Sequence, residues 1–360
     1  LSILLAVAIG SLAIALSHES PCEPGAATIG DAVRMKAIMS RCYGPPSVLT
    51  LEEVAKPVPA ENQILVKVHA AGVNPLDWHT MRGEPYVMRL SSGFGRPKDV
   101  TVGVDFSGTV EAAGAQVTRF KVGDAVFGGR AGALGEYVVV REAGSVATKP
   151  DSISFEQAAA VPIAAITALQ ALRDNGKLQP GQKVLINGAS GGVGTFAVQI
   201  AKAMGAEVTG VCSTRNVELV RSLGADRVID YTRENFTEED VDYDLIIDNV
   251  GNQGLLKVRD VMKPGATIVM VGGQSTDVWI GPLWRWIKAA MLSPFVDEEL
   301  SGIMAQLNQA DLELLAGMMR DGKVTAVIDR TYARAETAEA IEYLETGRAR
   351  GKVVVRVASE

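Results

Sequence analysis

The chain has 360 residues, of which 47% are hydrophobic, 21% charged and 5% aromatic, and this balance excludes an intrinsically disordered protein. Its formal net charge of −7 argues against a nucleic-acid-binding protein, because such proteins usually present a basic surface. The length is sufficient for two domains with well-buried cores.

The first 16 residues are apolar and carry no charged side chain, and residues 17–33 resemble a polar linker that contains Gly and Pro. The apolar run is shorter than the about 20 residues of a full membrane span, and no basic segment precedes it. Three interpretations stay open: a membrane anchor or export signal, a start site placed too far upstream, and a core helix. The first would bring the protein into contact with a membrane through residues 1–16.

Three cysteines, Cys22, Cys42 and Cys212, stand far apart in the sequence. Their spacing predicts neither a disulfide framework nor a paired metal site. We therefore expect three ordinary small side chains and a reducing compartment, which means a cytoplasmic location for the folded domains.

Folded character begins near Met35 and is at first of the β type. Residues 64–73 alternate between apolar and polar side chains, and short strands are expected at 108–112, 124–127 and 136–140. Short strands separated by Gly and Pro predict an antiparallel, barrel-like β domain.

Strand and helix patterns alternate after residue 154. An Ala-rich helical stretch at 155–175, broken at Pro162, precedes a series of shorter elements. Strands are expected at 183–187, 207–212, 227–229, 245–248 and 267–271, and helices at 193–204 and 216–223. This alternation predicts a parallel sheet covered by helices. The tail is predicted to form a strand at 324–328, a helix at 336–345 and a strand at 352–357, and to close onto the first domain.

The segment Asn187-Gly-Ala-Ser-Gly-Gly-Val-Gly194 joins an apolar strand to an amphipathic helix. Its glycines allow a tight turn and close approach of the backbone to phosphate, and the helix start offers N–H groups and the positive end of a dipole. This strand–turn–helix context predicts a dinucleotide site. The expected pyrophosphate-binding residues are Ser190, Gly191, Gly192, Val193 and Gly194.

The end of the next strand distinguishes the two nicotinamide cofactors. An NAD site usually places Asp or Glu there, but this strand ends in Ser213, Thr214 and Arg215. Because Arg215 can pair with a 2′-phosphate, we expect NADP(H), with Ser213 and Tyr231 as further contacts. Asn249 and Gly272 follow the fourth and fifth strands and are expected to line the cofactor site.

Residues 181–202 resemble the signature of the quinone oxidoreductase/zeta-crystallin branch of the medium-chain dehydrogenase/reductase superfamily. The resemblance covers about residues 35–357 and includes Ala71-Gly-Val-Asn-Pro-Leu-Asp, Gly103-Val-Asp-Phe-Ser-Gly, Leu223-Gly-Ala-Asp-Arg-Val-Ile-Asp-Tyr and Ala349-Arg-Gly-Lys-Val-Val. The last motif is similar to the reticulon-interacting subgroup, which implies that Ala349 and Arg350 approach the nicotinamide half of NADPH.

The resemblance implies an α/β protein with two domains and usually a homodimer. A GroES-like β-barrel catalytic domain would comprise residues 35–158 and 322–360, and a Rossmann domain with a doubly wound parallel sheet would comprise residues 159–321. Residues 1–34 would precede both.

Zinc-dependent members of the superfamily carry Cys and His where this chain has Asn74 and Val104. The structural lobe with four cysteines is absent as well. Since a catalytic zinc needs about three protein ligands, we expect no metal.

Hydride transfer without a Lewis acid suits an acceptor that conjugation already activates, such as a quinone or an α,β-unsaturated carbonyl. The resemblance places Asn74 beside the nicotinamide, and Tyr86 is a candidate donor to a developing oxyanion. His79 is expected to be structural. An enoyl-thioester reductase and an NADPH-binding structural or regulatory protein with little turnover are the alternatives.

Residues 278–292 hold three of the four tryptophans of the chain. This segment is interpreted as an apolar wall of the acceptor pocket, as a dimer or membrane-facing surface, or as part of the core.

Overall fold

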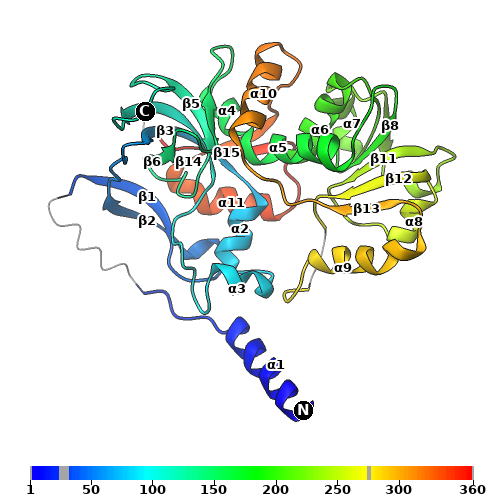
Figure 1. Cartoon of the computed structure of the whole chain (residues 1–360), viewed down its shortest axis with the longest axis horizontal. Helices are drawn as coiled ribbons and strands as arrows, with labels where there is room; N and C mark the ends of the chain where they lie inside the picture. The colour runs from blue at the N-terminus through cyan, green and yellow to red at the C-terminus, as the bar shows by residue number, and fades with distance from the viewer. Residues whose placement is uncertain (1, 24–31, 274–276, 359–360) are drawn as a thin grey trace.

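The structure is a computed structural model that describes residues 2–23, 32–273 and 277–358. Figure 1 shows two sheets with their helices side by side, and one helix, α1 (Ser2–Ser17), that stands away from the body of the molecule. The expected α/β fold is confirmed by this arrangement.

The first sheet has seven strands in a path β14-β15-β3-β4-β5-β7, and β6 also pairs with β3. The chain tail supplies β14 and β15, so the tail completes a sheet whose other strands come from the first half of the chain, as predicted. The strands are β3 (Gln63–Val73), β4 (Asp105–Ala113), β5 (Ala125–Gly129), β6 (Tyr137–Arg141), β7 (Val146–Thr148), β14 (Ile328–Ala333) and β15 (Lys352–Arg356). A separate hairpin consists of β1 (Arg34–Ser40) and β2 (Leu49–Ala55).

The second sheet has six parallel strands in the order β10-β9-β8-β11-β12-β13. The order reverses between β8 and β11, so a ligand is expected beyond the carboxyl ends of these strands. The strands are β8 (Lys183–Asn187), β9 (Glu207–Cys212), β10 (Arg227–Asp230), β11 (Tyr243–Asp248), β12 (Met262–Met270) and β13 (Glu299–Gly302). The short β13 lies at the edge and was not predicted.

Helices cover both faces of the parallel sheet because its central strands are apolar on both sides. Ile186 of β8 packs on the face that also buries Phe196 of α6, whereas Leu185 packs on the opposite face with Val258 of α8 and Ala289 of α9. The helices of this layer are α5 (Pro162–Gln170), α6 (Gly192–Ala203), α7 (Val217–Ser222), α8 (Leu255–Arg259), α9 (Leu283–Leu292) and α10 (Gln309–Arg320). The first sheet carries α2 (Pro75–Arg82), α3 (Arg89–Ser92), α4 (Phe155–Ala159) and α11 (Thr337–Glu345).

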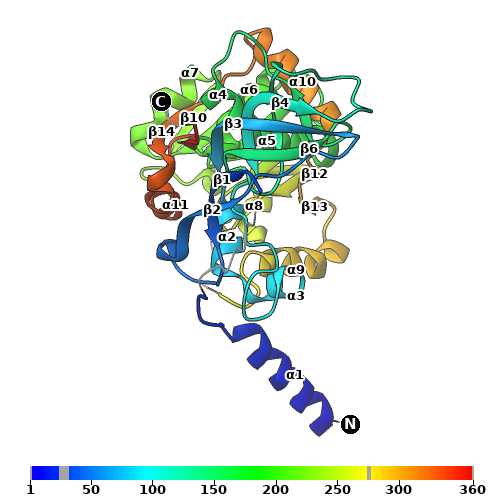
Figure 2. The same ribbon diagram turned by 90° about the vertical axis from the view of Figure 1, so that its left-hand side faces the viewer.

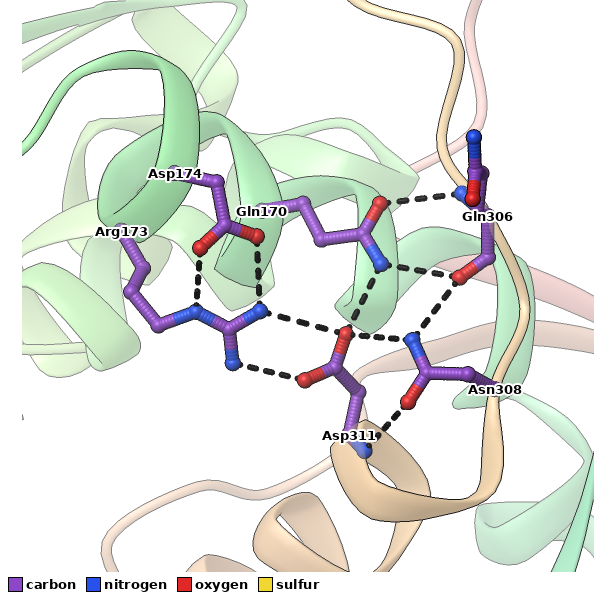
Figure 3. Close-up of polar contacts among 6 residues, drawn as sticks. All are labelled: Gln170, Arg173, Asp174, Gln306, Asn308 and Asp311. Atoms are coloured by element: carbon purple, nitrogen blue, oxygen red, sulfur yellow. Dashed lines mark hydrogen bonds and ion pairs between the residues drawn. The ribbon is translucent and has the colours of Figure 1, made fainter.

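A polar network fixes α10 against the end of α5, which continues as a π-helical turn at Ala171–Asn175 (Figure 3). Arg173 Nη1 donates to Asp311 Oδ1 at 2.6 Å, and Gln170 Nε2 donates to Asp311 Oδ2 at 2.8 Å. Gln170 also exchanges two hydrogen bonds with the backbone of Gln306. These residues line an open cavity of about 550 Å³, which none of the predicted site residues lines.

The predicted strand at residues 324–328 is wrong, since β14 begins only at Ile328. The side chain of Gln199 accounts for the difference. Its Oε1 accepts from Thr325 N at 2.8 Å, and its Nε2 donates to Thr325 O at 3.0 Å. Both backbone groups of Thr325 are therefore bound by a helix side chain and not by a neighbouring strand, although Val324 and Ala326 are buried as a strand pattern would suggest.

The expectation of three unpaired cysteines is also wrong. Cys22 and Cys42 form a disulfide, while Cys212 is free and buried. The partners meet because residues 17–23 are not a loose linker: Ser20 N donates to Gly95 O at 2.8 Å and holds this segment against the first domain. A spacing of 20 residues contains no sign of that contact. The argument for a reducing, cytoplasmic location, which rested on unpaired cysteines, therefore falls.

The C-terminal end of helix α1 lies at the body of the molecule, and the helix projects away from the body toward the N-terminus, as both Figure 1 and Figure 2 show. Leu16 is buried, but Leu12 is 46% exposed and Ile14 is 72% exposed, so residues 10–17 do not form a core helix. None of the helices in the part of the chain that the structure describes is long and apolar enough to cross a membrane.

Arg89 fixes the end of α1 to the first domain. Its side chain is fully buried, and its guanidinium donates to the backbone oxygens of Leu16 and Gly83 at 2.9 and 2.8 Å. The same group pairs with Glu19 and lies 4.4 Å from the ring centres of both Tyr43 and Tyr86. One buried guanidinium thus donates hydrogen bonds to backbone oxygens from segments that are far apart in the sequence.

Replacing Arg89 by Met keeps an unbranched apolar stem but removes the guanidinium, which leaves these buried carbonyl oxygens without donors. We expect Arg89→Met to lower the free energy of unfolding by about 3 kcal/mol, measured by urea denaturation. Arg96→Met is the matched control, because the side chain of Arg96 is 63% exposed, and it should unfold like the wild type. Equal stability of the two variants would contradict the role given to Arg89.

Candidate active site

The glycine loop between β8 and α6 is held in its turn by close packing. Gly188 has φ +79°, and a Cβ there would lie 2.7 Å from Val250 Cγ2. A Cβ on Gly194 would lie 2.1 Å from the carbonyl oxygen of Gly188. Both positions therefore require glycine, the first for its backbone conformation and the second for the approach of helix to loop.

The first residues of α6 are partly exposed. Gly191 is the N-cap and offers no side chain, so no side-chain hydrogen bond satisfies the first N–H groups of the helix. A Cβ on Gly191 would meet only one atom outside its neighbours, the Gly188 oxygen at 3.5 Å. Unpaired N–H groups at a helix start with free space before them fit a pyrophosphate. Ser190, Gly192, Val193 and Gly194 lie at this junction, where the sequence predicted them.

The tail of the chain lies directly against the glycine loop. Gly351 N donates to Ser190 O at 2.8 Å, in a short parallel bridge between Gly191 and Gly351. The neighbouring residues are the two that the family resemblance selected: Ala349 is partly buried, and the exposed Arg350 donates its backbone N–H to Asp329 Oδ2 at 3.0 Å. The tail thus reaches the candidate phosphate site from the first domain.

Polar side chains gather at the end of β9, where the adenosine ribose is expected. Asn216 Nδ2 donates to Ser190 Oγ at 2.9 Å and to Ser213 Oγ at 3.3 Å, and Asn216 Oδ1 is buried with no hydrogen-bond partner in the part of the chain that the structure describes. Arg215 is exposed, and its Nη2 donates to the Arg348 carbonyl oxygen at 2.7 Å. This contact holds a guanidinium beside the tail and beside Ser213.

Asp230 ends the adjacent strand β10, and its carboxylate contacts this group through Thr214. Its Oδ2 accepts from the hydroxyl of Thr214 at 2.6 Å, and its Oδ1 accepts from the hydroxyl of Thr232 at 2.8 Å. The hydrogen bond from Thr214 holds the pKa of Asp230 below its usual value. Tyr231, a predicted contact, follows Asp230 and is 57% exposed.

The ends of β11 and β12 form the other half of this edge. Asn249 Nδ2 donates to Asn187 O at 2.9 Å, whereas Asn249 Oδ1 is buried and has no partner among the described residues. Gly272 packs closely against Asn249, because a Cβ on Gly272 would lie 2.6 Å from the backbone carbonyl oxygen of Asn249. An unpartnered buried acceptor at this edge is an independent sign that a polar group of a ligand belongs there.

Asp248, just before Asn249, organises this corner. It accepts from Asn187 Nδ2 at 2.8 Å and from Gly251 N at 2.9 Å, and it pairs with Arg285 of α9 at 2.5 Å. The carboxylate is 1% exposed, so the ion pair is almost fully removed from water. It attaches α9 to the carboxyl edge of the sheet.

A buried ionic network lies where β3 ends and β15 begins. The ammonium of Lys352 donates to Asn74 Oδ1 and, at 3.1 Å, to Val73 O, and it lies 3.7 Å from Asp105 Oδ2. Asn74 Nδ2 donates to the same Asp105 oxygen at 2.9 Å. The amide of Asn74 is 2% exposed and is fixed in one orientation by these two partners.

This network lies immediately behind the glycine loop. A Cβ on Gly192 would lie 3.2 Å from Lys352 Cδ, so the lysine stem packs on the start of α6. Asp77, the third residue of α2, accepts from Asn74 N at 2.7 Å and is also buried. Burial raises the pKa of Asp77 to about 7 and that of Asp105 to about 6, and it lowers the pKa of Lys352. Lys352 and Asn74 counteract the increase for Asp105, which is why its pKa stays lower.

The residues present do not fit a catalytic zinc ion. Asn74 occupies one expected ligand position with an amide already bound to Lys352 and Asp105, and Val104 supplies no ligand atom at the other. In the described ranges, no group of three or more His, Cys, Asp and Glu side chains is arranged to hold a metal.

Tyr86, the second predicted catalytic residue, belongs to a different set of contacts from Asn74. Its ring packs edge-on against Trp279 with 5.2 Å between centroids, and its backbone N–H donates to Val278 O at 2.7 Å. The described residues offer its hydroxyl no hydrogen bond, so the phenol remains a free donor. His79 is a structural residue as expected: its Nδ1 bonds the Glu84 oxygen, its ring stacks on Trp78, and burial lowers its pKa.

Sequence reasoning missed Lys352, Asp105, Asn216, Asp248 and Arg285. The first two carried a usable signal, since each is a charged residue inside or at the end of an apolar β run, where it must be buried and paired. Asn216 and Arg285 stood in helical segments without any such pattern. Their roles depend on contacts with strands that lie far away in the sequence.

Comparison with known proteins gives two family matches. Residues 60–151 match the alcohol dehydrogenase GroES-like domain, and residues 223–355 match the zinc-binding dehydrogenase family.

Full-length relatives agree with these matches. The mitochondrial NAD(P)H oxidoreductase RTN4IP1 of Mus musculus is 36% identical over 344 residues, covering 82% of this chain and 82% of the relative. The 2-methylene-furan-3-one reductase of Solanum lycopersicum is 34% identical over 359 residues, covering 96% and 84%. Among solved structures, the quinone oxidoreductase from Coxiella burnetii superposes with a TM-score of 0.79 at 33% identity, covering 91% of this chain and 100% of that one.

The buried carboxyl of Asp77 predicts a distinct pH dependence of stability. Its folded pKa of about 7 lies above the ordinary value of 3.8, so between these values the folded chain holds a proton that the unfolded chain has released. The free energy of unfolding should therefore fall as pH rises through this window. Asp77→Asn removes the titration, and we expect a smaller loss of stability than in the wild type between about pH 5 and about pH 7.5.

Urea denaturation at both pH values measures this difference. The control is Asp242→Asn on the exposed surface, which should keep the wild-type dependence. If Asp77→Asn and the wild type lose equal amounts of stability between the two pH values, the carboxyl of Asp77 is not the group that holds the extra proton in the folded chain.

Proposed function

The chain belongs to the medium-chain dehydrogenase/reductase superfamily, in its zinc-free, quinone oxidoreductase-like branch, and on this premise we propose that it transfers hydride from NADPH to a quinone or an α,β-unsaturated carbonyl. It is an oxidoreductase, and members of this family bind nicotinamide cofactors. The choice of NADPH and of the acceptor is the proposal.

The observation that carries the proposal is the position of Lys352. Its stem packs on Gly192 at the start of α6, and its ammonium holds the amide of Asn74 at the end of β3. One buried side chain thus joins the candidate phosphate site to the candidate catalytic loop, at a place where zinc ligands are missing. An acceptor activated by conjugation needs no Lewis acid, which suits this arrangement.

The bound cofactor would supply the hydride, and the protein would position the reactants. Ser190, Gly191, Gly192, Val193 and Gly194 would hold the pyrophosphate at the helix start, as their geometry allows. The Oδ1 of Asn249, which has no partner among the described residues, offers a hydrogen-bond acceptor to the ribose or the carboxamide, and Gly272 packs against the backbone carbonyl of Asn249. Asn74, held by Lys352 and Asp105, would border the nicotinamide as a rigid polar surface.

The free hydroxyl of Tyr86 is the proposed donor to the acceptor oxygen, where negative charge develops. No other described contact uses this hydroxyl, whereas both polar atoms of the Asn74 amide are engaged. We therefore assign proton or hydrogen-bond donation to Tyr86 and positioning to Asn74.

The preference for NADPH rests on the surroundings of Ser213 and Arg215. Arg215 is held at the tail by the Arg348 oxygen, and Arg350 and Ala349 follow in the same segment. Asp230, the carboxylate that Thr214 binds, already accepts from the hydroxyls of two threonines, so it does not need a ribose hydroxyl as a partner. Tyr231 is exposed beside them and is assigned to the same end of the cofactor.

We further propose the domain limits 35–158 with 322–360 for the catalytic domain and 159–321 for the cofactor domain. A homodimer is proposed through the edge strand β13, whose outer side pairs with no strand among the described residues.

The proposed reaction is tested by the oxidation of NADPH, followed at 340 nm, with a short 1,4-quinone, an α,β-unsaturated ketone and an enoyl thioester as separate acceptors. We expect turnover with the quinone or the ketone and less with the thioester. Tyr86→Phe should lower kcat by about 10²-fold, the usual contribution of a positioned donor, and leave the affinity for NADPH unchanged. Tight binding of NADPH without turnover of any acceptor would favour a structural or regulatory role.

Arg215→Ala tests the cofactor. Loss of a charge-assisted bond to the 2′-phosphate should weaken NADPH binding by about tenfold or more and leave NADH binding nearly unchanged. Isothermal titration with both cofactors measures this. The control is Arg221→Ala on the exposed side of α7, where Arg221 pairs with Glu218. Equal losses for NADPH and NADH, or none, would rule out the assignment of Arg215.

A further inference from the structure

The helix α9 presents its apolar side chains to the outside. Trp284, Ile287 and Met291 follow one another at helical spacing and are 45%, 40% and 68% exposed. The side that faces the protein carries Ala289, which is 1% exposed, and Arg285, which pairs with Asp248. A surface helix ordinarily buries its apolar face, so the arrangement in α9 is reversed. Of its two tryptophans, Trp286 is the one that packs against the core.

Further apolar side chains are exposed next to α9 in the sequence and on the first domain. Trp279 before α9 is 42% exposed and Phe295 after it is 83% exposed. On the first domain, Leu90 and Phe94 are 50% and 51% exposed in and just after α3. Figure 1 and Figure 2 agree that α1, α3 and α9 lie on the same side of the molecule, with α1 projecting furthest. We call this set, with Leu12 and Ile14 of α1, the apolar face.

The parts of the apolar face are joined by direct contacts. The guanidinium of Arg89 binds the end of α1 and stacks on Tyr86. Tyr86 packs on Trp279, and the backbone N–H of Val87 donates to Trp279 O at 3.0 Å. The N-terminal helix and the tryptophan segment therefore have a fixed relation, although they stand at opposite ends of the sequence and on different sheets.

The chemistry of α1 decides which partner fits. Its sequence is apolar around the whole circumference and has no charged residue. A helix that is apolar on every side is stable when it is surrounded, either by a protein core or by lipid. Since α1 projects from the body, a second copy of the chain resting on α9 would cover only part of it, whereas lipid would cover all of it.

The composition of α9 agrees with the same partner. Tryptophan side chains are enriched where membranes meet water, and lysine stems lie along apolar surface while their charge stays in water. Lys288 borders the exposed stripe, with its Nζ 5.7 Å from the centre of the Trp284 ring. Helices of this kind lie in the plane of the interface without crossing the membrane.

We propose that the apolar face docks on the surface of a lipid bilayer, with α1 inserted among the lipids and α9 lying in the interface. This inference does not depend on the proposed reaction, although Tyr86, the proposed donor, lies between the end of α1 and Trp279. It fixes the orientation of the protein: α9 is attached to the carboxyl edge of the parallel sheet by Arg285 and Asp248, so that edge would stand next to the bilayer.

The test is flotation of the full chain with phosphatidylcholine vesicles, and separately with vesicles that also contain phosphatidylserine. Two double variants alter the two halves of the face: Leu12→Glu with Ile14→Glu in α1, and Ile287→Glu with Met291→Glu in α9. The control is Val58→Glu, at a residue that is 87% exposed and lies outside the face. Circular dichroism melting and light scattering of each protein report folding and oligomeric state.

We expect the wild type and Val58→Glu to float with both kinds of vesicle, and each double variant to partition about tenfold or more weakly. Flotation with the phosphatidylserine vesicles alone would identify a charge effect and overturn the proposal. Loss of binding in the α1 variant alone would also overturn the proposal, because α1 would then act as a simple N-terminal anchor without α9. If the α9 variant dissociates a dimer without affecting flotation, the occupant of this face is a second copy and the proposal fails.

Discussion

A lysine ammonium buried among an amide, a carbonyl and a carboxylate is the contact on which the rest of the site depends. Lys352 belongs to the last strand, Asn74 to the end of β3 and Asp105 to β4, while the stem of the lysine packs on the glycine loop. A buried charge is tolerated only when it is paired and hydrogen-bonded. Lys352 reaches the glycine loop only when the C-terminal strand β15 returns to the first sheet. This requirement is consistent with a first sheet whose strands come from both ends of the chain, with the parallel sheet between them in the sequence.

The fold and the turn that carries the candidate phosphate site were largely predictable from the sequence because both depend on local patterns. Residues 183–187 and 207–212 were predicted as strands with the observed limits, and the glycines between β8 and α6 lie in the expected turn. The strand predicted at residues 324–328 failed because a side chain from a distant part of the sequence binds the backbone there. Thr325 sits in an apolar run, yet its backbone is bound by Gln199 of α6, and no pattern within residues 324–328 contains that information.

The candidate site was predictable by type of residue and less by arrangement. Asn74 was selected as a polar group beside the cofactor, and the structure adds that its amide is already occupied by Lys352 and Asp105. The distinction changes its chemistry, because an amide with both polar atoms engaged can position a ligand but has little capacity to exchange a proton. Tyr86, whose hydroxyl is free, differs in this respect, and only three-dimensional contacts separate the two.

The N-terminal segment shows how one burial requirement links distant parts of the chain. Arg89 is fully buried, so it needs acceptors, and it finds them in the backbone at the end of α1 and at Gly83. The disulfide between Cys22 and Cys42 closes the same region covalently. Arg89 also stacks on Tyr86, and Tyr86 touches Trp279, so the end of α1 is joined by direct contacts to the tryptophan segment. The burial of one guanidinium therefore fixes the apolar helix and the proposed donor Tyr86 relative to one another.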